Sequence, residues 1–138
     1  MTIRRAMLLT GGLALLAVPF LFWLVMLSPL TYEYPEDWQM PDHDTTHTVF
    51  VYGTLKSAPL RWLVMGRAGQ PAQYTLQGYE RQGLDITENP DASVEGLLLE
   101  VSAGELRKLD RYERIGIRYE RVQILRENGS GIWVYRRL

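Results

Sequence analysis

Two short segments of the chain carry the residue types that could do chemistry. Residues 49–56 read VFVYGTLK, a β-branched and aromatic run that enters a turn at Gly53. Because a helix is predicted after this turn, its backbone N–H groups point into a common space that can hold a carboxylate or a developing oxyanion. Taken alone, the pattern is more often an ordinary strand-to-helix turn.

The second segment, residues 106–113, reads LRKLDRYE and closes a predicted amphipathic helix at Glu113. The C-terminal end of a helix is the less favourable end for a negative charge, because of the helix dipole. Glu113 therefore either serves a purpose other than helix stability or is a surface residue paired with Arg111 or Arg114. On local features alone, the surface pair is favoured.

Composition excludes several kinds of site. The chain has no cysteine, which excludes disulfides, thiolate metal ligands and a cysteine nucleophile. The formal net charge is −1 and no basic block occurs, so we expect no nucleic-acid partner. His43 and His47 stand in a stretch with Pro41 and lack a third neutral ligand, so a solvated linker is favoured over a metal site.

The elements that must position these segments are short. Residues 48–52 are the strongest strand signal, and a helix is predicted from Ser57 to its closing Gly66. Ser102 and Glu105 form a capping-box pattern at the start of the helix that ends near Glu113. Further strands are predicted at residues 73–79, 94–101, 119–125 and 132–135. A loop is predicted at residues 83–93 and a hairpin turn at residues 128–131. The pattern predicts a small α+β domain whose strands wrap towards a barrel.

An apolar segment precedes this domain. Residues 6–32 contain no charged residue. This uncharged segment is long enough to form a membrane-spanning helix. Arg4 and Arg5 precede it, and no small-x-small cleavage site follows, so an uncleaved signal-anchor is favoured. The predicted organisation is a single-pass transmembrane helix at 1–32, an acidic linker at 33–47 and a folded domain at 48–138.

The charges that flank the apolar segment predict how the chain is oriented in the membrane. Lys and Arg favour the cytoplasmic side, which places the amino terminus inside and the domain outside, in the periplasm if the host is a bacterium. Tyr34 and Trp38, close after the apolar run, are interpreted as part of an aromatic belt at the membrane interface.

Taken together, the motifs resemble a known family. VFVYGTLK, GLLLEV leading into a helix, LDRYE and YER occur in this order over residues 48–136, and this resembles the gamma-glutamylcyclotransferase-like superfamily. The resemblance implies a small mixed β-barrel with short helices that acts on a γ-glutamyl amine or amide without a cofactor or metal. It assigns the catalytic general acid and base to Glu113. The implied substrate-binding residues are Tyr52, Gly53, Thr54, Leu55 and Tyr119.

The implied chemistry is an intramolecular aminolysis that releases 5-oxoproline. The substrate's α-amine attacks its own γ-carbonyl, and one carboxylate can first accept and then return a proton. The chain departs from the family pattern at residues 56–61, which read KSAPLR where members often carry a glycine and an asparagine. The alternative is therefore a non-catalytic ligand-binding or interaction module of the same fold. A small membrane-protein subunit that contacts an unidentified protein is a third possibility.

Overall fold

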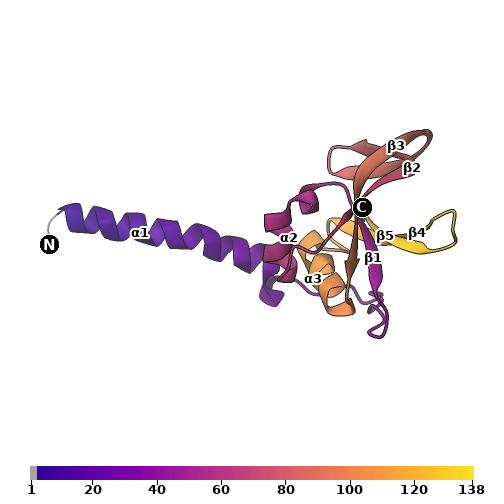
Figure 1. Cartoon of the computed structure of the whole chain (residues 1–138). Coiled ribbons are helices and arrows are strands. Elements are labelled where there is room, and N and C mark those ends of the chain that lie inside the picture. The colour runs from indigo at the N-terminus through magenta and orange to yellow at the C-terminus, as the bar shows by residue number, and fades with distance from the viewer. Residues whose placement is uncertain (1–2) are drawn as a thin grey trace. The chain divides into compact units, whose positions relative to one another are not determined.

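The computed structural model describes residues 3–138, so Met1 and Thr2 of the predicted anchor lie outside the described residues. The chain separates into two compact units, Met1–Glu33 and Tyr34–Leu138. The first unit contains α1 (Ile3–Phe22), a π-helical turn η1 (Trp23–Leu27) and a 3₁₀ turn η2 (Pro29–Thr31), as Figure 1 shows.

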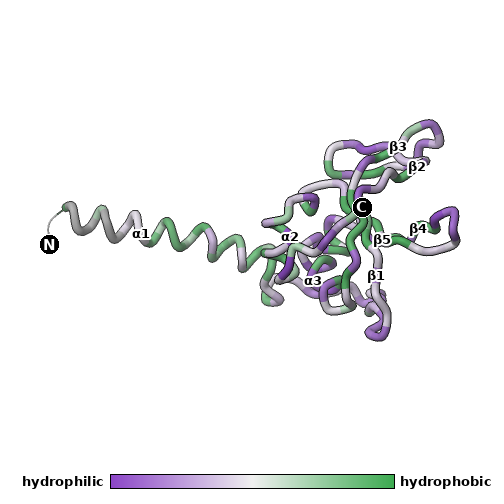
Figure 2. Tube along the Cα trace, viewed as in Figure 1, coloured by the Kyte–Doolittle hydropathy of each residue, from purple (hydrophilic) through white to green (hydrophobic). Residues whose placement is uncertain are grey.

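The first unit is apolar along most of its length. Figure 2 shows mostly hydrophobic residues along the coloured part of α1, and the segment Thr10–Leu27 has a mean hydropathy of 2.1. By length and composition this segment can cross a membrane, a property that N-terminal signal sequences share.

The second unit is built on one mixed sheet. Its strand order is β2-β3-β1-β5-β4, with β1 and β5 parallel and the other neighbours antiparallel. The strands are β1 (His47–Val51), β2 (Ala72–Gln82), β3 (Asp85–Val101), β4 (Tyr119–Leu125) and β5 (Gly131–Arg137). In Figure 1 the sheet curls strongly, and the outer ends of the β2–β3 and β4–β5 hairpins diverge. The predicted α+β fold, with strands that wrap towards a barrel, is confirmed: the five strands form a curled half-barrel (Figure 1).

Three short helical elements accompany the sheet. They are η3 (Thr54–Lys56), α2 (Ala58–Met65) and α3 (Ala103–Glu113). Figure 1 shows α2 and α3 next to each other beside the sheet. The predicted capping box is present at the start of α3, and Gly66 ends α2 in the left-handed conformation at φ 87°.

The central strand β1 carries the core. Val49, Phe50 and Val51 are all buried, because β1 lies between β3 and β5 and is covered on both faces. A strand covered on both faces reads as a continuous apolar run, which explains why residues 48–52 gave the strongest strand signal. The apolar side of α3, Leu106 and Leu109, is fully buried.

The loop predicted at residues 83–93 is wrong, because β3 already begins at Asp85. Gly83, at φ 64°, makes a tight turn that pairs Gln82 with Asp85 and so extends the hairpin. The turn signal at residues 89–91 is real but local: the backbone N–H of Asp91 donates to Asn89 Oδ1 at 3.1 Å. This turn falls where the β2–β3 register shifts, so it is accommodated as an irregularity within a long strand.

The first residues of the second unit pack against α3. The Tyr34 hydroxyl donates to the carbonyl of Arg107 at 2.7 Å, and Trp38 Nε1 donates to Asp110 Oδ2 at 2.9 Å. Residues 34–39, called the strap below, therefore belong to the folded unit, whereas the sequence predicted that Tyr34 and Trp38 lie in a belt at the membrane interface.

Candidate functional site

Glu113 occupies the last position of α3, at a sharp change of chain direction. The next residue, Arg114, has φ 53° and ψ 56°, and its backbone N–H closes the helix on the carbonyls of Asp110 and Arg111. A left-handed conformation costs a non-glycine residue about 1 kcal/mol, so the chain turns here at some expense. The turn leaves Glu113 at the rim of the helix, with its side chain partly buried.

The Glu113 carboxylate is desolvated and has no close partner. Within residues 3–138 it forms no hydrogen bond or ion pair, so the surface pair with Arg111 or Arg114 is not made. Burial raises the pKa of Glu113 to about 7, and the positive charge of Arg118 opposes this only in part. An unpaired carboxylate with such a pKa can accept and return a proton near neutral pH.

Two tyrosine hydroxyls meet near Glu113. The Tyr119 hydroxyl donates to the carbonyl of Leu84 at 3.1 Å, and the Tyr52 hydroxyl lies 3.3 Å from the same oxygen. Burial raises the pKa of both tyrosines, and the negative charge of Glu113 raises each further. The structure therefore brings Tyr52, Tyr119 and Glu113 into one electrostatic environment.

The turn after β1 faces the same region. Thr54 Oγ1 and the hydroxyl of Tyr112, the residue before Glu113, lie 3.3 Å apart. Thr54 and Leu55 open η3, and the first N–H groups of a helical turn have no partner within it. Leu55 is only 3% exposed, so its side chain packs in the core and any role in binding falls to its backbone N–H. Gly53 lies beside the Leu84 side chain.

Sequence reasoning missed Arg61, which holds this turn in place. Its side chain is buried, and Nη1 donates to the carbonyls of Leu55 at 3.0 Å and Lys56 at 2.7 Å. Nε donates to the carbonyl of Ala68 at 2.7 Å. A signal was available: Arg61 shares helical spacing with the buried Val64 and Met65, where a charge is unexpected. The segment 56–61, which departs from the family pattern, thus contains the arginine that stabilises the turn.

Sequence reasoning also left Asp110 without a role, although it belongs to the LDRYE motif. Asp110 is fully buried and accepts hydrogen bonds from the Tyr135 hydroxyl at 2.6 Å and from Trp38 Nε1 at 2.9 Å. Arg121 Nε lies 3.0 Å from Asp110 Oδ1. Burial raises the pKa of Asp110, and Arg121 opposes the shift. The signal was its place on the buried face of α3, one position after Leu109.

The Asp110 network leads directly to the candidate site. The carbonyl of Tyr135 accepts a hydrogen bond from the Tyr52 hydroxyl at 2.7 Å. Asp110, Tyr135 and Tyr52 thus form a continuous chain of contacts from α3 to the residue before Gly53. This chain fixes the helix that carries Glu113 relative to the turn after β1.

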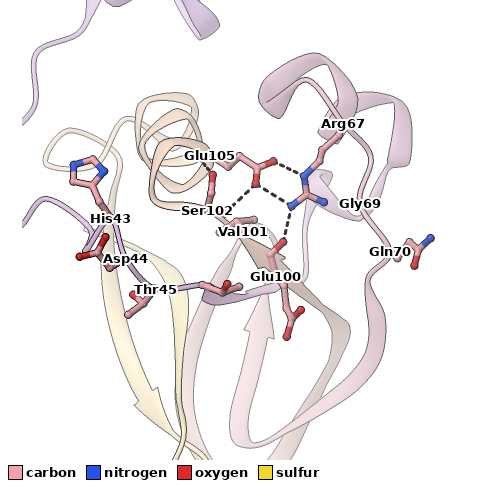
Figure 3. Close-up of a pocket in the computed structure, with 11 residues that line it drawn as sticks. His43, Asp44, Thr45, Arg67, Gly69, Gln70, Glu100, Val101, Ser102 and Glu105 are labelled. Atoms are coloured by element: carbon pink, nitrogen blue, oxygen red, sulfur yellow. Dashed lines mark hydrogen bonds and ion pairs between the residues drawn. The ribbon is translucent and has the colours of Figure 1, made fainter.

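A charged groove elsewhere in the second unit contains none of the predicted site residues (Figure 3). Its arginine, Arg67, is held by Glu105 through Nε at 2.6 Å and Nη2 at 2.9 Å, and it also donates to the carbonyl of Glu100. Because Glu105 is the capping-box residue of α3, these charges are engaged in holding the fold. Among residues 3–138, no group of three or more His, Cys, Asp or Glu side chains is placed to hold a metal ion.

Comparison with known proteins identifies relatives. Residues 49–137 match the family model described as gamma-glutamyl cyclotransferase, AIG2-like. A solution structure of an Arabidopsis thaliana protein is 30% identical, with a TM-score of 0.56 over 67% of this chain and 69% of that one. A second Arabidopsis thaliana solution structure is 26% identical, with a TM-score of 0.53 over 76% and 66%. A structure named gamma-glutamyl cyclotransferase shares the fold at 14% identity, with a TM-score of 0.50 over 68% of each chain. Comparison with curated protein sequences gives no match.

Proposed function

Because the chain belongs to the gamma-glutamyl cyclotransferase, AIG2-like family, we propose that it releases 5-oxoproline from a γ-glutamyl amine or amide, with Glu113 as general acid and base. The observation that carries this proposal is the unpaired Glu113 carboxylate, whose pKa is raised by burial to about 7. A general acid–base group works best when its pKa lies near the operating pH.

The reaction needs two proton transfers at one position. The substrate's α-ammonium gives a proton to the Glu113 carboxylate, and the free amine attacks the γ-carbonyl carbon. A C–N bond forms, which closes a five-membered ring and places negative charge on the carbonyl oxygen. The carbonyl then re-forms, the bond to the leaving amine breaks, and that nitrogen takes the proton from Glu113. The ring nitrogen still carries one extra proton, which passes to the released amine, so the amine leaves as an ammonium and Glu113 is again a carboxylate. Since the nucleophile and the carbonyl belong to one molecule, holding the reactive conformer supplies much of the rate.

The turn after β1 is proposed to bind the substrate. The backbone N–H groups of Gly53, Thr54 and Leu55 are the donors assigned to the substrate's carboxylate or developing oxyanion. Arg61 supports this role by holding the carbonyls of Leu55 and Lys56, which fixes the conformation of the same turn. The hydroxyls of Tyr52 and Tyr119 line the space beside Glu113.

The test is the release of 5-oxoproline by the full chain in detergent, offered a panel of γ-glutamyl amines and dipeptides. We expect Glu113→Gln to lower the rate by about 10²–10⁴-fold, the usual contribution of a general acid–base group. Glu127→Gln is the matched control, because Glu127 is an exposed residue of the β4–β5 turn. It should leave the rate unchanged.

Two results would contradict the proposal in different ways. Equal rates for the native chain and Glu113→Gln would remove Glu113 from the catalytic role. No release from any substrate by the folded native chain would instead favour the alternative, a ligand-binding or interaction module of the same fold.

We further propose that residues 1–32 are a signal-anchor, with the amino terminus in the cytoplasm and the domain outside. This is supported by the apolar segment Thr10–Leu27 and by the two arginines that precede it. The chain has no cysteine, so Asn128→Cys in the exposed β4–β5 turn gives a single labelling site. A membrane-impermeant maleimide should label it in intact cells. Labelling only after the membrane is broken would show that the domain lies in the cytoplasm, which contradicts the proposed orientation.

A further inference from the structure

We propose that the strap, residues 34–39, positions Glu113, and that Trp38 is the positioning residue. The inference rests on the proposed role of Glu113. The strap precedes the family-matched residues 49–137. It contacts the chain on both sides of Glu113.

Before Glu113, the strap contacts Asp110. Trp38 Nε1 donates to Asp110 Oδ2 at 2.9 Å, and Asp110 is fully buried. A buried carboxylate needs hydrogen-bond donors, because each carboxylate oxygen left without a donor retains its full desolvation penalty. The carbonyl of Asp110 also accepts the N–H groups that end α3, including that of Ile115 at 3.2 Å. Trp38 therefore fixes the residue on which the last turn of the helix closes.

After Glu113, the strap contacts Gly116. A Cβ at Gly116 would overlap the ring of Pro35, so this ring packs directly against the Gly116 backbone, as closely as a glycine allows. The N–H of Gly116 donates to the carbonyl of Tyr119 at 2.8 Å, which ties this point to the start of β4. Pro35 and Trp38 act as one piece, because the N–H of Trp38 donates to the carbonyl of Pro35 at 2.9 Å.

The strap is itself held firmly enough for this role. The rings of Tyr34 and Trp38 stack at a centroid distance of 4.2 Å. The guanidinium of Arg107, on α3, lies 5.8 Å from the Tyr34 ring and 5.7 Å from the Trp38 ring. On the other side, Arg121 Nη2 donates to the carbonyl of Gln39 at 3.1 Å. The strap thus bridges α3 and β4, the two elements that carry Glu113 and Tyr119.

The consequence is a Glu113 carboxylate held in a place with little water. If the strap is released, the end of α3 loosens, water reaches Glu113 and its pKa falls. Other charged or titratable groups also act on this region. They are Arg118, Tyr52, Tyr119 and Tyr135, with Asp85, Arg81 and Arg137 around the two tyrosines Tyr52 and Tyr119. None of these groups is changed by a substitution in the strap.

The test compares Trp38→Phe with the native full chain in detergent. Phenylalanine keeps an aromatic ring for Tyr34 and Arg107 but has no N–H for Asp110. The readout is the titration of Glu113, followed by NMR of ¹³C-labelled glutamate carboxyls, with Glu113→Gln to identify its signal. We expect the midpoint to move from near 7 towards the ordinary value by about one pH unit. Trp62→Phe is the control, because Trp62 is 63% exposed on α2; it should leave the midpoint in place.

Turnover gives a second, independent readout. We expect Trp38→Phe to lower kcat by about tenfold or more with KM unchanged, since a small displacement of a catalytic group is costly. If the native chain shows no turnover, the proposed function fails, whereas the titration still tests the strap. An unchanged midpoint in folded Trp38→Phe would overturn the inference. If that variant does not fold, Pro35→Ala, which removes the ring from Gly116, is held to the same criterion.

Discussion

Glu113 gives the domain a pH dependence that does not depend on any substrate. Its folded-state pKa of about 7 lies above the ordinary value of 4.5. Between these values the folded state holds a proton that the unfolded state has released, so stability falls as pH rises through this window. Below it, both states are protonated and the penalty is absent.

Glu113→Gln should therefore be more stable than the native chain at pH 8, by up to roughly 3 kcal/mol, since one pKa unit corresponds to about 1.4 kcal/mol. Near pH 4 the two should differ little. Urea unfolding at several pH values measures the difference. A difference that stays constant from pH 4 to pH 8 would show that Glu113 is solvated.

The two tyrosines should separate stability from activity. Tyr52→Phe removes a buried donor from the carbonyl of Tyr135, so it should cost about 1–2 kcal/mol of stability. Tyr119→Phe removes only an exposed bond to Leu84 and should cost about 0.5 kcal/mol or less. If Tyr119 contacts the substrate, 5-oxoproline release falls in Tyr119→Phe although its unfolding midpoint is kept. Equal losses of stability would contradict the assignment of Tyr52 to the core network.

At the scale of elements, the two ends of α3 have different roles. Its first turn is stabilised by the capping box, and its last turn carries Glu113. The Ser102 hydroxyl accepts from the N–H of Glu105 at 3.2 Å, and the Glu105 carboxylate accepts from the N–H of Ser102 at 2.9 Å. Ser102→Ala should destabilise the domain by about 0.5–2 kcal/mol. Ser93→Ala, at an exposed strand position, is the control in the same urea titration. A loss no larger than that of the control would mean that the cap is dispensable.

The elements that could be predicted from the sequence are those whose determinants are close together in the chain. The capping box spans residues 102–105, as predicted. A hairpin turn was predicted at residues 128–131; the turn lies at residues 126–130, and Gly131 already pairs with Leu125. The extent of β3 could not be predicted, because its turn residues sit inside a strand that is held by pairing with β2.

The site was predictable only in part for the same reason. Glu113 and the turn after β1 were identified from motifs, whereas their supports depend on distant contacts. Trp38 and Asp110 meet from 72 positions apart, and the acceptors of Arg61 are carbonyls, which leave no trace in side-chain types. A charged residue at an apolar helix position was the one signal available for Arg61 and Asp110.

At the scale of the whole molecule, the second unit begins with the strap. The second unit starts at Tyr34, so a fragment 34–138 should fold, whereas a fragment 45–138 lacks Trp38 and leaves Asp110 short of a donor. We expect the shorter fragment to be less stable by about 2 kcal/mol or more, as for a buried charged group that loses a partner. Thermal unfolding of both fragments measures this. Equal melting temperatures would show that the strap adds no stability.

The parallel pairing of β1 with β5 also orders the events of biosynthesis. Val49 pairs with Trp133 and Phe50 with Val134, so β1 can pair with β5 only after residues 131–137 have left the ribosome. Pairings this distant in sequence form late, after most of the chain is available. The apolar helix α1, in contrast, precedes both strands in the chain and needs no partner to form its own hydrogen bonds. The helix can therefore form before the sheet that makes up the second unit.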